Sequence, residues 1–411
     1  MNTLKFITAG NVDDGKSTLI GRLLYDSNSI HTDQLGVLQN KVANEGDEID
    51  LALITDGLRA EREQGITIDV AYKYFSTAKR KFIIADAPGH EQYTRNMITG
   101  ASTSDLIIIL VDARKGITSQ TKRHGSIGSL MGIKKAVVAV NKIDLVNYSE
   151  EVFNNIKQDF EILQQALDYN DVIFIPVSAL VGDNIVDKSI KTAWYQGDTL
   201  LSTLENIESD TTANLPSRFQ VQWVIRPKDE EFHDYRGYAG QIQSGTYKMG
   251  DQVKILPSGI ETEISKIEKH HKEVEKAVAG ENVVLHLKDN IDISRGDTII
   301  LHNENPKSSN EIKSWICWLD QTPLQQGKTY LLQHRFKTVR VKIQNIDKQW
   351  NINEWKFNST DDIKLNDIGQ VTLRTNQPLF FDAFKDNTKT GNAILIDETT
   401  YNTVGALMFL N

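Results

Sequence analysis

The chain of 411 residues has little cysteine and no long apolar run. Its single cysteine, Cys317, excludes an internal disulfide and a cysteine-rich zinc site, and we expect it to be a buried, inert thiol. The longest apolar run, Leu106 to Val111, is far shorter than the roughly 20 residues that cross a bilayer. The run is typical of a buried strand, and no membrane segment is expected.

The sequence also lacks an excess of basic residues. It has 46 Lys and Arg against 55 Asp and Glu, a net charge of -9. Phosphate backbones are bound by clustered Lys and Arg, so we expect no nucleic-acid partner. The first residues, Met1 to Lys5, lead into an apolar run without the pattern of a signal peptide. A cytoplasmic location is therefore expected.

Residues 1–208 have the pattern of an α/β domain. Hydrophobic residues at 39% and charged residues at 25% are typical of globular proteins, and the chain is too long for one core. Short β-rich runs alternate here with helical patterns, which predicts a mostly parallel sheet with helices on both faces. The runs are 81–85, 106–111, 136–140 and 172–177. Apolar residues at helical spacing between the last two runs are Phe153, Ile156, Phe160, Leu163 and Leu167.

Proline is scarce in this first part and marks strand ends. Of the 8 prolines, only Pro88 and Pro176 fall before residue 209. Both follow or close an apolar run, where a functional loop would begin.

The remaining sequence predicts two antiparallel β-barrels. A polar segment, 209–216, resembles a linker and is followed by short alternating runs at 219–225, 239–242, 252–256 and 283–287. A second break at 302–310 precedes runs at 338–343, 369–373 and 393–396. We therefore expect three domains: the α/β domain at 1–208 and barrels at 209–304 and 305–411.

A phosphate-loop pattern lies between the first apolar run and the first helical pattern. The loop residues that we assign to nucleotide binding are Gly10, Asn11, Val12, Asp13, Asp14, Gly15, Lys16, Ser17 and Thr18. Backbone N–H groups of such a loop, at a helix N-terminus, surround a polyphosphate. Lys16 is expected to reach the β- and γ-phosphates, and the Ser17 hydroxyl to bind Mg2+.

Two later segments predict the metal and γ-phosphate contacts. Asp86 ends a strand, so its carboxylate is expected at the Mg2+ site, through a water. Thr67 would complete the metal shell only when γ-phosphate is present, as a switch residue does. The assigned segment that begins at Asp86 is Asp86, Ala87, Pro88, Gly89 and His90. Gly89 offers its N–H to the γ-phosphate, and His90 stands where a GTPase orients the attacking water. Lys16, Thr67 and His90 are thus the expected catalytic residues.

Base recognition is assigned to two further segments. Asp144 can accept hydrogen bonds from guanine N1–H and the 2-amino group, neither of which adenine offers, so the site should choose GTP over ATP. Lys142 supplies an aliphatic stem along the base, and Asn141 ties the loops together. The second of these segments is Ser178, Ala179 and Leu180. The Ala179 N–H is expected to face guanine O6.

Each motif has a plain structural alternative. The phosphate loop could be a chance turn, Thr67 a strand residue and Asp86 a helix cap. The segment from Asn141 to Asp144 could be a surface turn, and a lone histidine such as His90 is usually structural. Their order and spacing along one chain favour the functional interpretation. The other histidines show no ligand spacing.

These motifs resemble the translational GTPase superfamily, and the three-part layout resembles elongation factor Tu. Longer strings are similar to the family of GTPase subunits of bacterial sulfate adenylyltransferase. They are 15–26, 48–53, 56–72, 89–97, 219–227 and 293–297. Asp14 fits this branch, since elongation factors usually carry histidine there.

The resemblance implies GTP and Mg2+ as cofactors and a separate, smaller catalytic subunit as partner. That subunit would join sulfate to the adenylyl group of ATP, and GTP hydrolysis on this chain would drive the reaction. Some members add an adenylylsulfate kinase domain; no second phosphate loop is present here, so no kinase activity is expected. Two alternatives remain at this point: a factor that delivers aminoacyl-tRNA and a stand-alone GTP-dependent scaffold.

Overall fold

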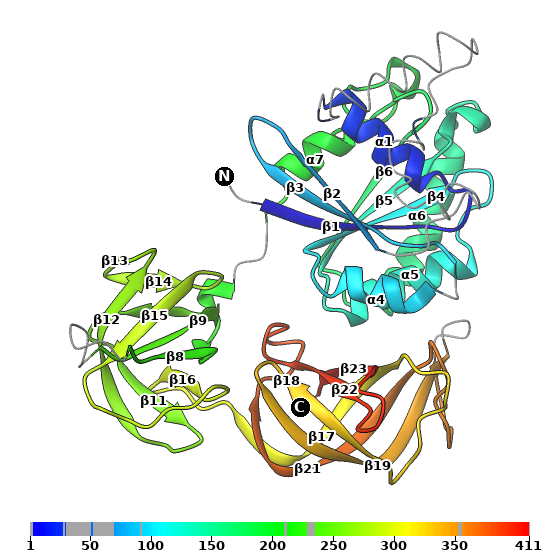
Figure 1. Ribbon diagram of the computed structural model, residues 1–411. Helices are drawn as coiled ribbons and strands as arrows, with labels where there is room; N and C mark the ends of the chain where they lie inside the picture. Colours follow the sequence, from blue (N-terminus) through cyan, green and yellow to red (C-terminus); the bar gives the residue numbers. More distant parts are fainter. Residues whose placement is uncertain are drawn as a thin grey trace. The chain divides into compact units, whose positions relative to one another are not determined.

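The structure is a computed structural model that describes residues 3–27, 29, 51, 70–90, 93–208, 212–227, 235–351 and 356–410. The chain divides into two compact units. The N-terminal unit holds the described residues up to 208, and the C-terminal unit holds those from 212 onward. Figure 1 shows the elements of each unit.

The N-terminal unit is an α/β domain. Its strands are β1 (Thr3–Ala9), β2 (Ala71–Ser76), β3 (Lys81–Asp86), β4 (Leu106–Asp112), β5 (Lys135–Asn141) and β6 (Asp171–Pro176). Its α-helices are α1 (Lys16–Asp26), α4 (Thr94–Ala101), α5 (Ser119–Leu130), α6 (Glu150–Gln164) and α7 (Leu200–Asn206). The predicted apolar stripe is buried along α6 as far as Leu163, but the helix ends at Gln164, so Leu167 lies beyond it.

One sheet runs through this unit in the order β2-β3-β1-β4-β5-β6. All neighbours are parallel except β2 and β3, so the predicted mostly parallel sheet is confirmed. The register pairs Thr8 with Asp86 and Asp112 with Asn141. These residues therefore lie at the carboxyl edge of the sheet, where α/β proteins bind ligands.

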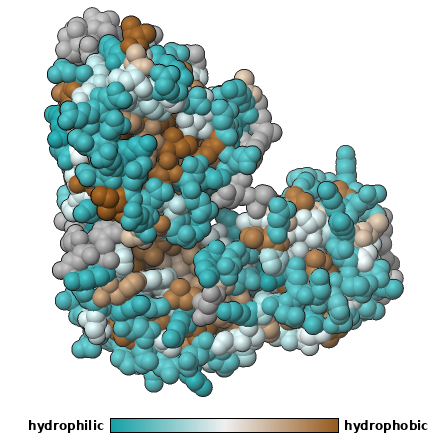
Figure 2. All heavy atoms as spheres, turned by 180° about the vertical axis from the view of Figure 1, so that it is seen from behind, coloured by the Kyte–Doolittle hydropathy of each residue, from teal (hydrophilic) through white to brown (hydrophobic). Residues whose placement is uncertain are grey.

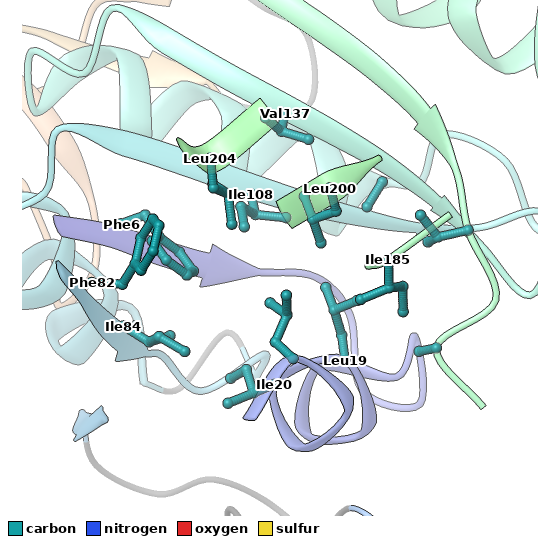
Figure 3. Packing of buried hydrophobic residues seen from close by; sticks show 14 of the residues in the cluster. Phe6, Leu19, Ile20, Phe82, Ile84, Ile108, Val137, Ile185, Leu200 and Leu204 are labelled. Atoms are coloured by element: carbon teal, nitrogen blue, oxygen red, sulfur yellow. The ribbon is translucent and has the colours of Figure 1, made fainter. Parts of the chain in front are cut away.

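Helices cover both faces of the sheet. Leu19 of α1 and Leu200 of α7 pack with Phe6 and Ile108 of the strands in one buried cluster (Figure 3). On the other face, α4 and α5 pack against β1 and β4. This layering fixes α1, and with it the phosphate loop, against the sheet edge.

The C-terminal unit contains two antiparallel barrels, as predicted. The strands of the first are β7 (Arg218–Gln220), β8 (Trp223–Ile225), β9 (Gly237–Ser244), β10 (Thr246–Lys248), β11 (Gln252–Leu256), β12 (Glu261–Lys269), β13 (Lys272–Glu273), β14 (Lys276–Val278), β15 (Asn282–Leu287) and β16 (Thr298–Leu301). Those of the second are β17 (Lys307–Trp318), β18 (Thr329–His334), β19 (Lys337–Asn351), β20 (Lys356–Asn358), β21 (Ile368–Phe381), β22 (Asn392–Ile396) and β23 (Thr403–Phe409).

Each barrel is a closed ring. Pairing of β11 with β12 closes the first, and pairing of β18 with β19 closes the second. The predicted break at 302–310 is too long, because β17 already begins at Lys307, which pairs with Phe381 of β21. The first residues of β17 are mostly exposed and polar, so they have the sequence of a loop. Cys317 lies in this strand and is buried, as predicted, and burial raises the pKa of its thiol to about 12.

A buried arginine joins the two barrels within the C-terminal unit. Arg218 of β7 donates from Nε and Nη2 to both carboxylate oxygens of Asp382, over 3.0 and 2.8 Å. Its Nη1 donates to Glu304 Oε2 over 2.8 Å. Asp382 also accepts from Thr390 Oγ1, and Glu304 from the Ser217 N–H. The guanidinium is therefore paired with both carboxylates where the barrels meet.

The surface seen in Figure 2 is mostly hydrophilic, with hydrophobic residues in small patches. Within the described ranges, no helix is both long and apolar enough to span a membrane.

Candidate nucleotide-binding site

The phosphate loop leaves β1 and enters α1 through two positions with positive φ, 67° at Asp13 and 93° at Gly15. A Cβ on Gly15 would lie 2.6 Å from Asn141 Nδ2, so glycine is required for its conformation and for space. The Asn11 N–H donates to Asp14 Oδ2 over 2.7 Å and closes the loop from within. Burial raises the pKa of Asp14.

Lys16 is a buried ammonium inside this loop. Its Nζ donates to the carbonyl oxygens of Gly10 and Asn11, over 3.0 and 3.1 Å. Burial lowers its pKa, and the nearby carboxylates of Asp86 and Asp14 oppose that effect. A buried cation hydrogen-bonded to neutral carbonyls is a site that an anion would stabilise.

The segment after β3 reaches the same loop. Asp86 Oδ1 accepts from Thr8 Oγ1 over 3.2 Å in the buried interior. A Cβ on Gly89 would lie 2.5 Å from the Gly10 carbonyl oxygen, so the Gly89 backbone lies directly against the phosphate loop. His90 is exposed, and its ring makes an edge contact with Tyr93 at 6.4 Å between centroids.

Asn141, at the end of β5, links three segments. Its Nδ2 donates to the Asp14 carbonyl over 2.7 Å, and its Oδ1 accepts from the Ala179 N–H over 2.9 Å. The predicted tie between the loops is therefore present. The same Ala179 N–H that we expect to face guanine O6 is thus already used by Asn141, and O6 could only share it.

Lys142 and Asp112 form an ion pair that the sequence did not predict. Lys142 Nζ lies 3.1 Å from Asp112 Oδ2 and donates to the Asp13 carbonyl. Although burial raises the pKa of Asp112, hydrogen bonds from Arg114 and Lys142 hold it well below its usual range. Asp112 could have been found in the sequence, because it directly follows the apolar run that became β4.

The other assigned residues occupy the same edge. Asp144 is half-buried in the turn after β5, Ser178 and Ala179 are buried after β6, and Leu180 is exposed. Ser17 and Thr18 lie half-buried in the first turn of α1. Of the remaining assigned residues, Val12 is half-buried in the phosphate loop, and Ala87 and Pro88 are buried after β3. Thr67 lies outside the described residues.

These residues fit a nucleotide and a metal ion. Lys16 supplies a buried positive charge, the glycine backbone of the loop leaves room for phosphate, and Ser17 with Asp86 supplies the oxygen donors that Mg2+ prefers. The site can bind a polyphosphate. The fold and the site together define a P-loop GTP-binding protein.

Comparisons with known families agree with this class. Residues 1–210 match the elongation factor Tu GTP binding domain family, 238–300 match elongation factor Tu domain 2, and 311–409 match the GTP-eEF1A C-terminal domain-like family. Crystal structures of Sup35 complexed with GMPPNP or GDP align with 100% of this chain and 94% of theirs, at 20% identity and a TM-score of 0.45.

Curated relatives identify the particular family. Sulfate adenylyltransferase subunit 1 of Alteromonas mediterranea is 48% identical over 412 residues, which are 99% of this chain and 87% of the relative. That of Shewanella oneidensis is 48% identical, over 99% of this chain and 85% of the relative. The bifunctional enzyme CysN/CysC of Mycobacterium tuberculosis is 49% identical, over 99% of this chain and 67% of that protein. This chain belongs to the family of sulfate adenylyltransferase subunit 1.

Proposed function

We propose that this chain is the GTPase subunit of a sulfate adenylyltransferase. It hydrolyses GTP to GDP and phosphate, and the released free energy drives ATP and sulfate to adenylylsulfate and pyrophosphate on a separate, small catalytic subunit. The observation that supports the GTPase assignment is the meeting of the phosphate loop, the Gly89 backbone and Asn141 at one sheet edge. The family of its relatives supports the coupled reaction.

The phosphate side of the site carries the hydrolysis in this proposal. Lys16 exchanges its carbonyl partners for the β- and γ-phosphates, and the Gly89 N–H binds the γ-phosphate. Ser17, Thr67 and Asp86 would hold Mg2+, which neutralises charge on the phosphates. His90 is exposed beside Gly89, so it can orient the attacking water without breaking a buried contact.

The base side selects GTP. Asp144 accepts from N1–H and the 2-amino group of guanine, while Asn141, Lys142 and the segment 178–180 frame the base. An adenine base would leave the carboxylate unpaired, at about 1 to 3 kcal/mol. The chain therefore binds one nucleotide, and ATP is consumed elsewhere.

The name "subunit 1" of the relatives implies a second subunit, which we propose to be the small catalytic one. We place the pair in the cytoplasm. Delivery of aminoacyl-tRNA is the weaker alternative, because the net charge of -9 opposes RNA binding and Asp14 departs from the elongation-factor pattern.

The decisive assay measures pyrophosphate release from ATP and sulfate by the reconstituted pair. It is run with GTP, with a non-hydrolysable analogue and without nucleotide. We expect net product to rise only with GTP, and this chain alone to make none. Equal progress in all three reactions would exclude the coupling. Stimulation of GTP turnover by ribosomes and tRNA would favour the delivery factor instead.

Coupling between GTP binding and binding of the small subunit must also be reciprocal. A partner that prefers the GTP-bound state must tighten GTP binding by the same factor, typically about 5- to 150-fold. A GTP titration with and without the small subunit measures that factor.

A further inference from the structure

Arg22 of α1 forms hydrogen bonds with the loop that follows β6. Its Nε donates to the Ala179 carbonyl over 3.3 Å, and its Nη2 donates to the Leu180 carbonyl. Its Nη1 lies 3.5 Å from Asp26 Oδ1, one turn further along α1. The planar guanidinium is therefore held by its own helix while it binds two successive carbonyls of the loop.

The other end of this loop is anchored separately. The Asp183 carboxylate accepts from Tyr148 Oη over 2.9 Å and from Ser189 Oγ over 2.7 Å, and its carbonyl accepts from the Ser178 N–H over 3.2 Å. The Gly182 N–H donates to the Ser178 carbonyl over 2.8 Å. These bonds fix both ends of the loop, but among the bonds described here only Arg22 binds the carbonyls of Ala179 and Leu180.

The peptide between Ala179 and Leu180 carries a donor that could meet a ligand. The Ala179 N–H is used by Asn141, whereas the Leu180 N–H has no hydrogen-bond partner within the described part of the chain. The C=O and N–H of a trans peptide are coplanar and point in opposite directions. By binding the Ala179 carbonyl, Arg22 thus fixes the direction of the Leu180 N–H.

We propose that Arg22 is a positioning residue for base recognition. It orients the Leu180 N–H so that this donor binds the 6-oxo group of guanine, while Asp144 binds the opposite edge of the base. This inference rests on the proposed function, since it assumes that the nucleotide is GTP. The two contacts are separable, because the described hydrogen bonds of Arg22 go to the loop after β6 and to Asp26 of its own helix, not to the turn that holds Asp144.

Lysine cannot replace arginine in this role. The ammonium of Lys is a single point charge, and it cannot present two parallel N–H donors in a rigid plane to successive carbonyls. Arg22→Lys keeps the charge beside Asp26 and loses the paired hydrogen bonds to the loop carbonyls. Arg22→Met removes both and keeps the apolar stem.

The test uses two GTP analogues that separate the two edges of the base. 6-Thio-GTP replaces the 6-oxo group and keeps N1–H and the 2-amino group, whereas ITP keeps the 6-oxo group and lacks the 2-amino group. Dissociation constants for GTP, ATP and both analogues are measured on the full chain with wild type, Arg22→Lys and Arg22→Met. The matched control is Lys157→Met, which removes another i,i+4 ion pair of the same unit, that with Glu161 at 3.9 Å.

We expect both Arg22 variants to bind GTP about tenfold more weakly while 6-thio-GTP binding changes little, since one hydrogen bond is lost. The preference for GTP over ITP should stay at the wild-type value. An equal loss for GTP and 6-thio-GTP would mean a merely structural role and overturn the proposal, as would unchanged affinities. Thermal melting shows whether each variant is folded, and Arg22→Lys serves if Arg22→Met is not. If wild type does not prefer GTP over ATP, the proposed function itself fails.

Discussion

Among the buried cations of this protein, Lys16 in the N-terminal unit and Arg218 in the C-terminal unit have different kinds of partner. Lys16 in the N-terminal unit is 8% exposed and Arg218 in the C-terminal unit is 5% exposed. Lys16 donates to backbone carbonyls, which carry no net charge. Arg218 donates to two carboxylates, and despite burial their hydrogen bonds raise its pKa.

The difference indicates what each charge is for. Carboxylates lie near Lys16, but its printed hydrogen bonds go to neutral carbonyls, so it lacks a directly hydrogen-bonded counter-charge that a bound anion could supply. A guanidinium paired with two carboxylates has no such deficit, and its contribution is to hold two barrels together. Changes near Lys16 should therefore alter nucleotide chemistry, and changes at Arg218 should alter stability.

The largest effect is expected for Arg218→Met. The substitution leaves Asp382 and Glu304 without their buried partner, which costs about 3 to 5 kcal/mol when one member of a buried pair is removed. Urea unfolding with hydrogen exchange should show the loss in the C-terminal unit, with GTP affinity within a few-fold of wild type.

The control for Arg218 is Arg374→Met. Arg374 pairs with Glu311 at 3.8 Å, with side chains 63% and 53% exposed, so its removal should cost less than about 1 kcal/mol. Equal destabilisation by both substitutions would contradict the special role of Arg218.

His90→Ala should have the opposite effect to Arg218→Met, because it should lower GTP hydrolysis and leave stability unchanged. Because positioning dominates phosphoryl transfer, single-turnover GTP hydrolysis should fall by about 100-fold or more. GTP affinity should stay within a few-fold and stability unchanged, because His90 is exposed. His270→Ala, another exposed histidine, is the control. A near-normal single-turnover rate would place catalysis elsewhere.

Asp144→Asn should change specificity more than strength of binding. Loss of the carboxylate should weaken GTP by about 5- to 150-fold and improve xanthosine triphosphate, because an amide can donate to the carbonyl that replaces the 2-amino group. Titration of both nucleotides measures the switch. Asp171→Asn, an exposed residue at the start of β6, should leave both affinities unchanged. Unchanged GTP affinity in Asp144→Asn would refute the assignment.

Much of the fold could be predicted because its pattern is local. The run 106–111 is apolar since every residue of β4 is buried, and its neighbours alternate with helical stripes. Several strands have no counterpart among the predicted runs, and two cases show a physical reason. Tyr72 and Tyr74 of β2 are exposed on an edge strand, and the start of β17 is polar because it is mostly exposed. Neither has a buried pattern that a sequence would reveal.

The candidate site also combines motifs that the sequence predicts with contacts that it does not predict. The phosphate loop and the segment from Asn141 to Asp144 are short motifs, so the sequence contains their whole signal. The contacts of Asp112 and Arg22 are set by the tertiary fold: Arg22 binds Ala179 across 157 positions of the chain. No local pattern predicts such a pair, because strand order and register bring its members together.

The smallest effect is expected from a change of pH. It again compares the two units, because each of them also buries a neutral histidine. Burial lowers the pKa of His124 to about 3, aided by the charges of Lys16 and Arg123. Burial lowers the pKa of His334 to about 4, although its hydrogen bond to the Thr390 carbonyl opposes this.

Both folded pKa values lie below the unfolded value of 6.5, so the unfolded chain takes up protons first as the pH falls. Each buried histidine should therefore leave the free energy of unfolding of its unit almost unchanged above pH 6.5. It should lower that free energy by about 1 kcal/mol by about pH 5.5. The loss should continue until the folded pKa is reached. Hydrogen exchange of the slowest amides in each unit, at about pH 7.5 and 5.5, measures it separately. His124→Gln should remove the dependence from the N-terminal unit alone and His334→Gln from the C-terminal unit alone. If either substitution left the pH dependence of its own unit intact, carboxylates rather than the buried histidine would control the acid stability of that unit.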